Sequence, residues 1–319
     1  MRSHVDVCDD RLLAVEALLE VRKKVKPYLD LQLVAFPQDG YFRSPNAARN
    51  LERALDLGVD VVGGIPHFER TMAEGAASVR ALCEIAANRG LMVDLHCDES
   101  DDPLSRHVET LAEAQRLGLG PRATGSHLTS MHSMDNCYVS KLLPLIAESG
   151  INAIANPLIN LTLQGRHDAY PRRRGLTRVA EMRALGIPVA LGQDCVMDPW
   201  YSLGGADMLD VAHMAVHGAP MTSREAIRWT FDAVTEIPAR ILGLEGYGLT
   251  VSANADMVLL QAADPIEAVR LRATRLFVIR RGKVVARTPA RETELSLQGR
   301  PGVLDPASYA PRQSDRMAP

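Results

Sequence analysis

Polar side chains suited to metal binding and acid–base chemistry stand at the ends of several short apolar runs in this sequence. The run L-M-V-D-L-H-C-D-E-S at residues 91–100 places His96 where the apolar residues stop and Glu99 just beyond them. His127 and Asp194 follow two later apolar runs in the same way. Two imidazoles and two carboxylates are enough to hold a divalent metal ion and to carry out acid–base chemistry. One histidine at a strand end is weak evidence, so the interpretation as a site depends on the recurrence of such residues at several strand ends.

The elements that must position these side chains alternate between strand and helix. The strand ends recur about every 30 residues, which is the period of a β-α unit. One expected helix spans residues 10–25, with Asp9 or Asp10 as its N-cap, and another spans 71–88, with Gly90 as its C-cap. The other expected helices span residues 46–57, 103–117, 140–149, 176–185, 207–216 and 223–242. The seven expected strands span residues 3–7, 31–36, 60–65, 123–127, 151–156 and 187–194, together with the run within 91–100.

This alternation predicts a parallel sheet closed into an α/β barrel over residues 1–248. The carboxyl ends of all strands in such a barrel lie on one rim, so residues far apart in the sequence meet there. Gln38, His67 and Asn156 follow three further strands and belong to the same rim. Beyond the barrel, residues 249–286 contain short β-runs and are expected to form a small β segment. Residues 287–319 are rich in Pro, Ser, Gln and charge, which is typical of a loosely ordered tail.

Composition narrows the class of protein. The chain has 319 residues and a net charge of −3, so it lacks the electrostatic footprint of a protein that binds nucleic acid or an anionic membrane. Its five scattered cysteines do not form a disulfide framework and fit a reducing cytoplasm. No apolar run approaches a membrane span, and the first residues lack the apolar stretch of a signal peptide. We expect a soluble, cytoplasmic chain of the size of an enzyme.

Several longer motifs surround the strand ends. They include V-D-L-H-C-D-E-S-D-D, G-S-H-L-T-S-M-H-S, A-N-P-L-I-N-L-T-L-Q-G-R, Y-P-R-R-R-G-L-T-R-V and G-Q-D-C-V-M-D-P-W-Y-S-L-G, with H-V-D-V and V-A-F-P-Q-D-G near the start. Up to about residue 286 the chain resembles the bacterial cytosine deaminases of the amidohydrolase superfamily. The resemblance implies a metal-dependent TIM-type (β/α)₈ barrel that hydrolyses the exocyclic amine of a pyrimidine and releases ammonia. It also implies a homo-oligomer.

Carried over to the matching positions, the resemblance implies a role for each residue of the first group. His96 and Asp194 would bind one divalent metal ion, Fe²⁺ or Zn²⁺, because His and Asp serve as ligands of both. Asp194 would also take a proton from the attacking water. Glu99 would carry a proton to the ring nitrogen and then towards the departing amine. His127 would hydrogen-bond the attacking oxygen and stabilise charge on the tetrahedral intermediate.

Other residues of the matching motifs would contact the substrate. Gln38 would hydrogen-bond the amide edge of the base, because an amide side chain offers both a donor and an acceptor. Trp200 would pack against the planar ring, although a core aromatic is an equally good interpretation of its sequence context. His67 stands where a lysine would be needed for a carbamate bridge between two metal ions. A single ion is therefore expected.

The chain departs from the family pattern at its start. The family begins its barrel with a strand that ends in H-x-H, and these imidazoles complete the metal site, but this sequence contains no H-x-H. The run from His4 to Asp6 matches the second strand of the family instead. We therefore expect a barrel that lacks its first strand, with the C-terminal β segment forming half of the small sandwich. Only two protein ligands then remain, where a catalytic zinc-type site has at least three.

Two hypotheses account for this departure. In the first, Met1 is an internal codon and a strand with an H-x-H lies upstream, which in-frame translation of the upstream DNA would reveal. A stop codon before any H-x-H would contradict it. In the second, the chain is a non-catalytic relative that binds a partner or a base. Metal content and ammonia release of this chain and of an extended version distinguish the two.

A second departure concerns the substrate. Cytosine-specific members commonly carry a second acidic residue after the aspartate, whereas here Cys195 follows Asp194 and Gln193 replaces a histidine before it. A small thiol leaves room and lowers polarity near the bound base. We expect Cys195 to line the pocket of a substrate other than plain cytosine, such as 5-methylcytosine, isocytosine or a triazine-like amine. Neither Cys97 nor Cys195 lies in a Cys–His arrangement, so neither is expected to be a nucleophile.

Overall fold

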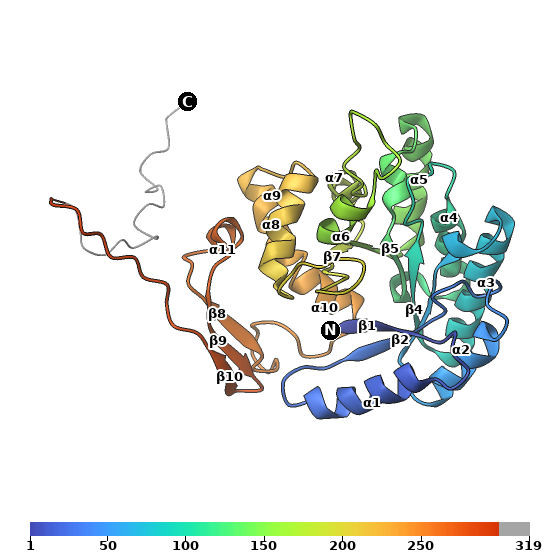
Figure 1. Ribbon diagram of the computed structural model, residues 1–319, viewed down its shortest axis with the longest axis horizontal. Coiled ribbons are helices and arrows are strands. Elements are labelled where there is room, and N and C mark those ends of the chain that lie inside the picture. Colours follow the sequence, from blue (N-terminus) through green and yellow to red (C-terminus); the bar gives the residue numbers. More distant parts are fainter. Residues whose placement is uncertain (300–319) are drawn as a thin grey trace.

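Within residues 1–299, which the computed structural model describes, seven short strands pair in chain order and curl into an open barrel (Figure 1). Every neighbouring pair is parallel, so all the carboxyl ends lie on one rim. The predicted TIM-type fold with seven parallel strands is confirmed. The strands are β1 (Arg2–Asp6), β2 (Gln32–Phe36), β3 (Val61–Gly64), β4 (Met92–Cys97), β5 (Ala123–His127), β6 (Asn152–Ala155) and β7 (Val189–Leu191).

Helices cover the outer face of the barrel and pack their apolar sides against the strands (Figure 1). Leu82 on a helix and Leu95 on a strand are fully buried where the two layers meet. Gly64 makes this approach possible, because a Cβ there would lie 2.4 Å from Cδ1 of Leu82. The helices are α1 (Leu13–Val25), α2 (Ala47–Asp56), α3 (Met72–Arg89), α4 (His107–Ala112), α5 (Asn136–Ser149), α6 (Pro157–Leu163), α7 (Val179–Ala184), α8 (Met208–Gly218), α9 (Arg224–Asp232), α10 (Glu236–Ile241) and α11 (Pro265–Leu271).

The capping residues expected from the sequence are right for one helix and wrong for another. α3 ends at Gly90, whose φ of 67° lies in the left-handed region that glycine adopts without strain. The expectation that Asp9 or Asp10 caps the first helix is wrong, because the N-cap of α1 is Leu12 and no side chain bonds there. Asp10 accepts a hydrogen bond from Asn50 of α2 instead, at 3.0 Å.

Two expected helices are interrupted by tertiary contacts. The helix expected at residues 103–117 begins only at His107, where the carboxylate of Asp98 accepts the first backbone N–H groups. The helix expected at 223–242 is divided into α9 and α10. The carbonyl of Ala233, between them, accepts a hydrogen bond from the backbone N–H of Leu191 in β7 at 2.9 Å. The seven-residue helices α6 and α11 are absent from the expectation, since they are too short to display apolar periodicity.

A small antiparallel sheet lies beside the barrel, formed by β8 (Met257–Leu260), β9 (Arg275–Arg280) and β10 (Lys283–Arg287), as the sequence predicts. The hairpin turn between β9 and β10 consists of Arg281 and Gly282, which both have positive φ. Residues 300–319 of the expected tail lie outside the described residues. Among residues 1–299, no helix combines the length and the apolarity needed to cross a membrane.

A buried ion pair lies inside the barrel, below the rim. Arg2 Nη1 is 2.8 Å from Asp94 Oδ2, and the two side chains are 6% and 1% exposed. Ser126 donates to the other oxygen of Asp94 at 2.7 Å. Burial opposes ionisation of Asp94, but Arg2 and the hydrogen bonds outweigh it and hold the pKa below its usual value. The pair connects β1 to β4, which are not neighbours in the sheet.

Removing one member of this pair leaves the other charge buried without a partner. We expect Asp94→Ala to lower the free energy of unfolding by about 3–5 kcal/mol, measured as a lower urea midpoint. The double variant Arg2→Met/Asp94→Leu should recover much of this loss, because no unpaired charge remains. Glu20→Ala breaks the exposed pair with Lys24 and is the control, with an expected change below about 1 kcal/mol. Equal losses in Asp94→Ala and Glu20→Ala would contradict the argument.

Candidate active site

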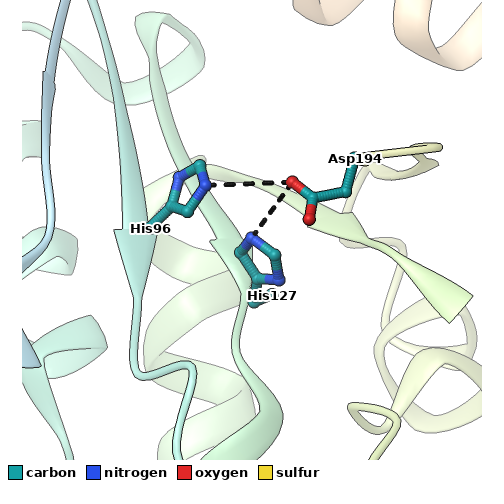
Figure 2. A group of neighbouring side chains, drawn as sticks. All are labelled: His96, His127 and Asp194. Carbon is teal, nitrogen blue, oxygen red and sulfur yellow. Dashed lines mark ion pairs between the residues drawn. The ribbon is translucent and has the colours of Figure 1, made fainter. Parts of the chain in front are cut away.

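Three side chains from separate strand ends meet at the rim of the barrel (Figure 2). His96 lies near the end of β4, and His127 is the last residue of β5. Asp194 belongs to the loop that follows β7 and enters from the opposite side in this view. Figure 2 shows both imidazoles facing the same carboxylate. The parallel sheet therefore brings together residues that are almost one hundred positions apart in the sequence, as predicted for the rim.

The donor atoms of these residues are close enough to surround one divalent ion, either as ligands or as neighbours of its bound water. One ligand atom from each lies within 4.8 Å of the other two. Asp194 Oδ1 is 3.9 Å from His96 Nε2 and 3.8 Å from His127 Nε2. Ligand atoms bound at about 2.0–2.2 Å to a shared ion are about 3–4 Å apart, and imidazole with carboxylate suits zinc or iron. Among residues 1–299, no second group of three such side chains is this close.

The backbone around these side chains adopts left-handed conformations that are uncommon for residues other than glycine. The value of φ is 73° at His127 and 64° at Asp194. Asp98, which directly precedes Glu99, has a φ of 54°. Such conformations cost about 1–3 kcal/mol each and persist only where the surroundings hold them. At the rim they turn side chains away from the strand direction and towards the opening.

Glu99 and His127 form an ion pair beside the three-residue group. Glu99 Oε1 is 3.0 Å from His127 Nδ1, and the two side chains are 16% and 0% exposed. Asn160 of α6 donates to the same Glu99 oxygen at 2.9 Å. The amide nitrogen of Asn156 is 3.3 Å from both ring nitrogens of His127, so it lies over the ring. Sequence reasoning missed Asn160, although the spacing of four in A-N-P-L-I-N places both asparagines on one helix face.

Burial and nearby charges set the protonation of the two imidazoles. Burial opposes the charged form of His127, but Glu99 and Asp194 outweigh it and raise its pKa to about 9. For His96, burial and the neighbouring imidazoles of His4 and His127 hold the pKa well below its usual value. A neutral imidazole offers a lone pair to a metal ion, whereas a protonated one donates hydrogen bonds. His96 is therefore suited to bind a metal and His127 to donate to an oxygen.

Oδ2, the other carboxylate oxygen of Asp194, accepts a hydrogen bond from Cys195. Cys195, predicted to line the substrate pocket, donates its S–H to Oδ2 of Asp194 at 3.4 Å. Burial and the charge of Asp194 raise the pKa of the Cys195 thiol, and burial raises that of Cys97. Both groups are protonated at neutral pH and are poor nucleophiles.

Gln38 and His67 also lie after strand ends, and Trp200 lies further along the loop that follows β7. Gln38 follows β2 and is half-buried, with its backbone N–H directed at Asp6. His67 lies in the 3₁₀ turn after β3, and burial lowers its pKa to about 4. Trp200 is 62% exposed, so the alternative that it is a core aromatic is wrong. The contacts of Gln38, Trp200 and Cys195 with a substrate stay predictions.

Gly192, beside the site, leaves room for the side chain of Asn156 against His127. A Cβ on Gly192 would lie 2.2 Å from the side-chain oxygen of Asn156. Any other residue at this position would displace the amide from His127. Gly192 follows β7 directly, so the same short segment makes room for Asn156 and leads to Asp194.

Behind the site, Asp98 holds the loop that carries Glu99. Its fully buried carboxylate accepts hydrogen bonds from Ser105 Oγ at 2.8 Å, His107 Nδ1 at 2.7 Å and the Val108 backbone at 2.8 Å. Burial opposes ionisation, but these donors outweigh it and hold the pKa of Asp98 below its usual value. The carboxylate thus joins the end of β4 to the start of α4.

Comparison with known proteins relates this fold and site to one family. Residues 3–287 match the model of the Amidohydrolase family. Pterin deaminase from Rhizobium rhizogenes is 31% identical over 300 residues, which cover 90% of this chain and 66% of that protein. N-isopropylammelide isopropyl amidohydrolase from a Pseudomonas species is 26% identical over 291 residues, which cover 90% of this chain and 68% of that protein. The chain spans about two thirds of the length of these relatives.

A solved structure is more similar in sequence. The crystal structure of 5-methylcytosine deaminase from Klebsiella pneumoniae, liganded with 5-fluorocytosine, superimposes with a TM-score of 0.89 at 44% sequence identity. The match covers 91% of this chain and 71% of that one. The similarity therefore extends over most of this chain.

Asp98→Asn tests whether an ionised carboxylate holds the loop behind the site. The folded pKa of Asp98 lies below its unfolded value of about 4, so the contribution is complete at neutral pH and is lost as the pH falls through the folded value. We expect metal-free Asp98→Asn to lose about 1–3 kcal/mol of unfolding free energy at pH 7 and progressively less below about pH 4. Urea unfolding across this range measures it. Asp102→Asn, exposed in the same loop, is the control. If Asp98→Asn lost the same unfolding free energy at every pH, an ionised Asp98 would not be what holds the loop.

Proposed function

Since the chain belongs to the amidohydrolase family, we propose that it is a metal-dependent hydrolytic deaminase of a pyrimidine-like base. The observation that carries the proposal is the convergence of His96, His127, Asp194 and Glu99 on one opening of the barrel. This set combines neutral and charged imidazoles with two carboxylates. Hydrolysis of a C–N bond in a cyclic amidine needs these functions in one place, because water must be activated and an amine must be protonated.

In this proposal His96 and Asp194 hold a single Fe²⁺ or Zn²⁺ ion. When bound, such an ion lowers the pKa of a water molecule so that it can attack at neutral pH. His96 is the neutral imidazole of the site and Asp194 directs Oδ1 towards it, which supports this choice of ligands. His127 has its charge held by Glu99, which favours a hydrogen-bonding role.

The two carboxylates, Asp194 and Glu99, carry out the proton transfers in this proposal. Asp194 takes one proton from the attacking water as the oxygen bonds to the carbon that carries the amine. Glu99 delivers the proton that lies between it and His127 Nδ1 to the adjacent ring nitrogen. Glu99 next accepts the hydroxyl proton and passes it to the amine, which leaves as ammonia while the carbonyl forms. The proton held by Asp194 restores Glu99, and His127 Nε2 hydrogen-bonds the reacting oxygen throughout.

We further propose that the substrate is 5-methylcytosine in preference to cytosine. The 44% identity to 5-methylcytosine deaminase supports this choice. Cys195 also supports it, because its small thiol bonds Asp194 and places no second carboxylate beside the bound base. A methyl group that fits such a pocket contributes about 1–3 kcal/mol of discrimination.

The proposal includes a small nucleobase-like substrate, a cytoplasmic location and a homo-oligomeric enzyme. The five cysteines are free thiols, which supports a reducing compartment. The homo-oligomer rests on the family resemblance.

Metal content separates a ligand from a hydrogen-bonding histidine. We expect the wild-type chain to bind one zinc ion and His96→Ala and Asp194→Ala to lose it, measured by equilibrium dialysis and elemental analysis. His127→Gln should keep most of the zinc but release ammonia at least about 100-fold more slowly, because it removes a donor to the reacting oxygen. His213→Gln, on α8, is the control. Loss of zinc in His127→Gln would make His127 a ligand instead.

Ammonia release with different bases tests the substrate. The zinc- or iron-loaded chain should have a kcat/KM for 5-methylcytosine about 10- to 200-fold above that for cytosine. Cys195→Asp should reduce this ratio, because a carboxylate takes up the space and adds polarity. Equal ratios in the two proteins would reject the role of Cys195. No ammonia from any of these bases, in a chain that holds its metal, would favour the base-binding, non-catalytic alternative.

A further inference from the structure

Asn160 lies beside Glu99 and His127, which share a proton in the proposed function. It stands one helical turn after Asn156, and its backbone N–H donates to the Asn156 carbonyl at 3.0 Å. Its side chain is completely buried. α6 follows β6 directly, so Asn160 is carried by a hydrogen-bonded helix, whereas Glu99 is carried by a loop.

The amide of Asn160 contacts Glu99 and His127 at the same time. Nδ2 donates to Glu99 Oε1 at 2.9 Å, and His127 Nδ1 is 3.1 Å from Nδ2 and 3.3 Å from Oδ1. Glu99 Oε1 and His127 Nδ1 are themselves 3.0 Å apart. The three polar groups therefore form a triangle, and the amide is its uncharged member.

Left-handed backbone, which persists only where surrounding contacts hold it, lies at or beside both charged residues. Glu99 follows Asp98, whose φ is 54°, and His127 has a φ of 73°. Among the residues that the structure describes, Asn160 and His127 are the side chains that bond the Glu99 carboxylate. Because an amide carries no charge, the bond from Asn160 persists whichever of Glu99 and His127 holds their shared proton.

We infer that Asn160 is a positioning residue that holds the carboxylate of Glu99 in register with His127. It acts through these two residues and needs no contact with the substrate. Its kinetic effect rests on the proposed function, whereas the contact itself does not. Loss of the amide leaves Glu99 free to rotate away from the ring nitrogen of the substrate.

The nitrogen resonances of His127 test the contact directly. In the full chain labelled with ¹⁵N-histidine, metal-free and zinc-loaded, the His127 signals are those missing from His127→Gln. We expect Asn160→Ala to shift the Nδ1 resonance of His127. Asn160→Asp, which keeps the shape of the side chain, should shift it as well and covers a folding failure of the alanine variant. An unchanged Nδ1 resonance in the folded variants overturns the inference.

Asn152→Ala is the matched control. Asn152 is a buried asparagine at the opposite end of β6, and its amide donates to the Pro121 carbonyl at 2.8 Å. Its removal should disturb packing without moving the His127 resonances. A similar shift in Asn152→Ala would mean that any buried asparagine produces the effect, and would overturn the inference.

Kinetics supply the second measurement. In ammonia release, Asn160→Ala should lower kcat by about 10- to 100-fold and change KM by less than about threefold, because the contact orients a proton carrier and not the substrate. A kcat no lower than that of Asn152→Ala overturns the positioning role. A wild-type chain that releases no ammonia contradicts the proposed function, and the resonance comparison still decides the contact.

Discussion

Parallel pairing of β4 with β5 is the constraint on which the site depends. It sets His96 and His127 on adjacent strands with their ring centroids 4.5 Å apart. Two protonated imidazoles would repel each other at this distance, so the structure must distinguish them. Burial keeps His96 neutral, while the carboxylates of Glu99 and Asp194 stabilise the charge of His127. Two identical side chains thereby acquire different chemistry from their surroundings.

The polar interior below the rim supports this arrangement. His4 of β1 packs edge-on against His96 with ring centroids 4.5 Å apart, and burial lowers its pKa. Further down, the Arg2–Asp94 ion pair joins β1 to β4. Replacing a buried ion pair by apolar side chains of similar volume often costs little stability. The ion pair instead fixes how the strand that carries His96 sits against β1.

Irregular backbone at the rim is held by contacts from outside the strands. The left-handed residues that direct Glu99, His127 and Asp194 carry local strain, and regular strand pairing ends where they begin. Asp98 anchors the β4 loop to the start of α4, and Asn160 reaches the same loop from α6. The site is thus a set of strained strand ends held by neighbouring helices and loops. The helices therefore help to position the site residues in addition to covering the outer face of the barrel.

The sequence by itself determined the order and kind of the main elements and the membership of the rim. Alternation of apolar runs and helical stretches is a local property, and parallel topology then places His96, His127 and Asp194 at one end of the sheet. Element boundaries were predictable where local signals dominate, as at Gly90. They failed where a distant group takes a backbone partner, as at Ala233.

Only the tertiary structure decided which polar groups touch and which of them is charged. Asn160 and Glu99 are 61 positions apart, and no periodicity in the chain connects a loop carboxylate to a helix amide. The charge of His127 depends on how far burial is offset by Glu99 and Asp194. Both the contact and the charge depend on distances in space between residues of different elements, and electrostatic energy is set by such distances and by burial. Sequence patterns report only the backbone elements that carry these side chains.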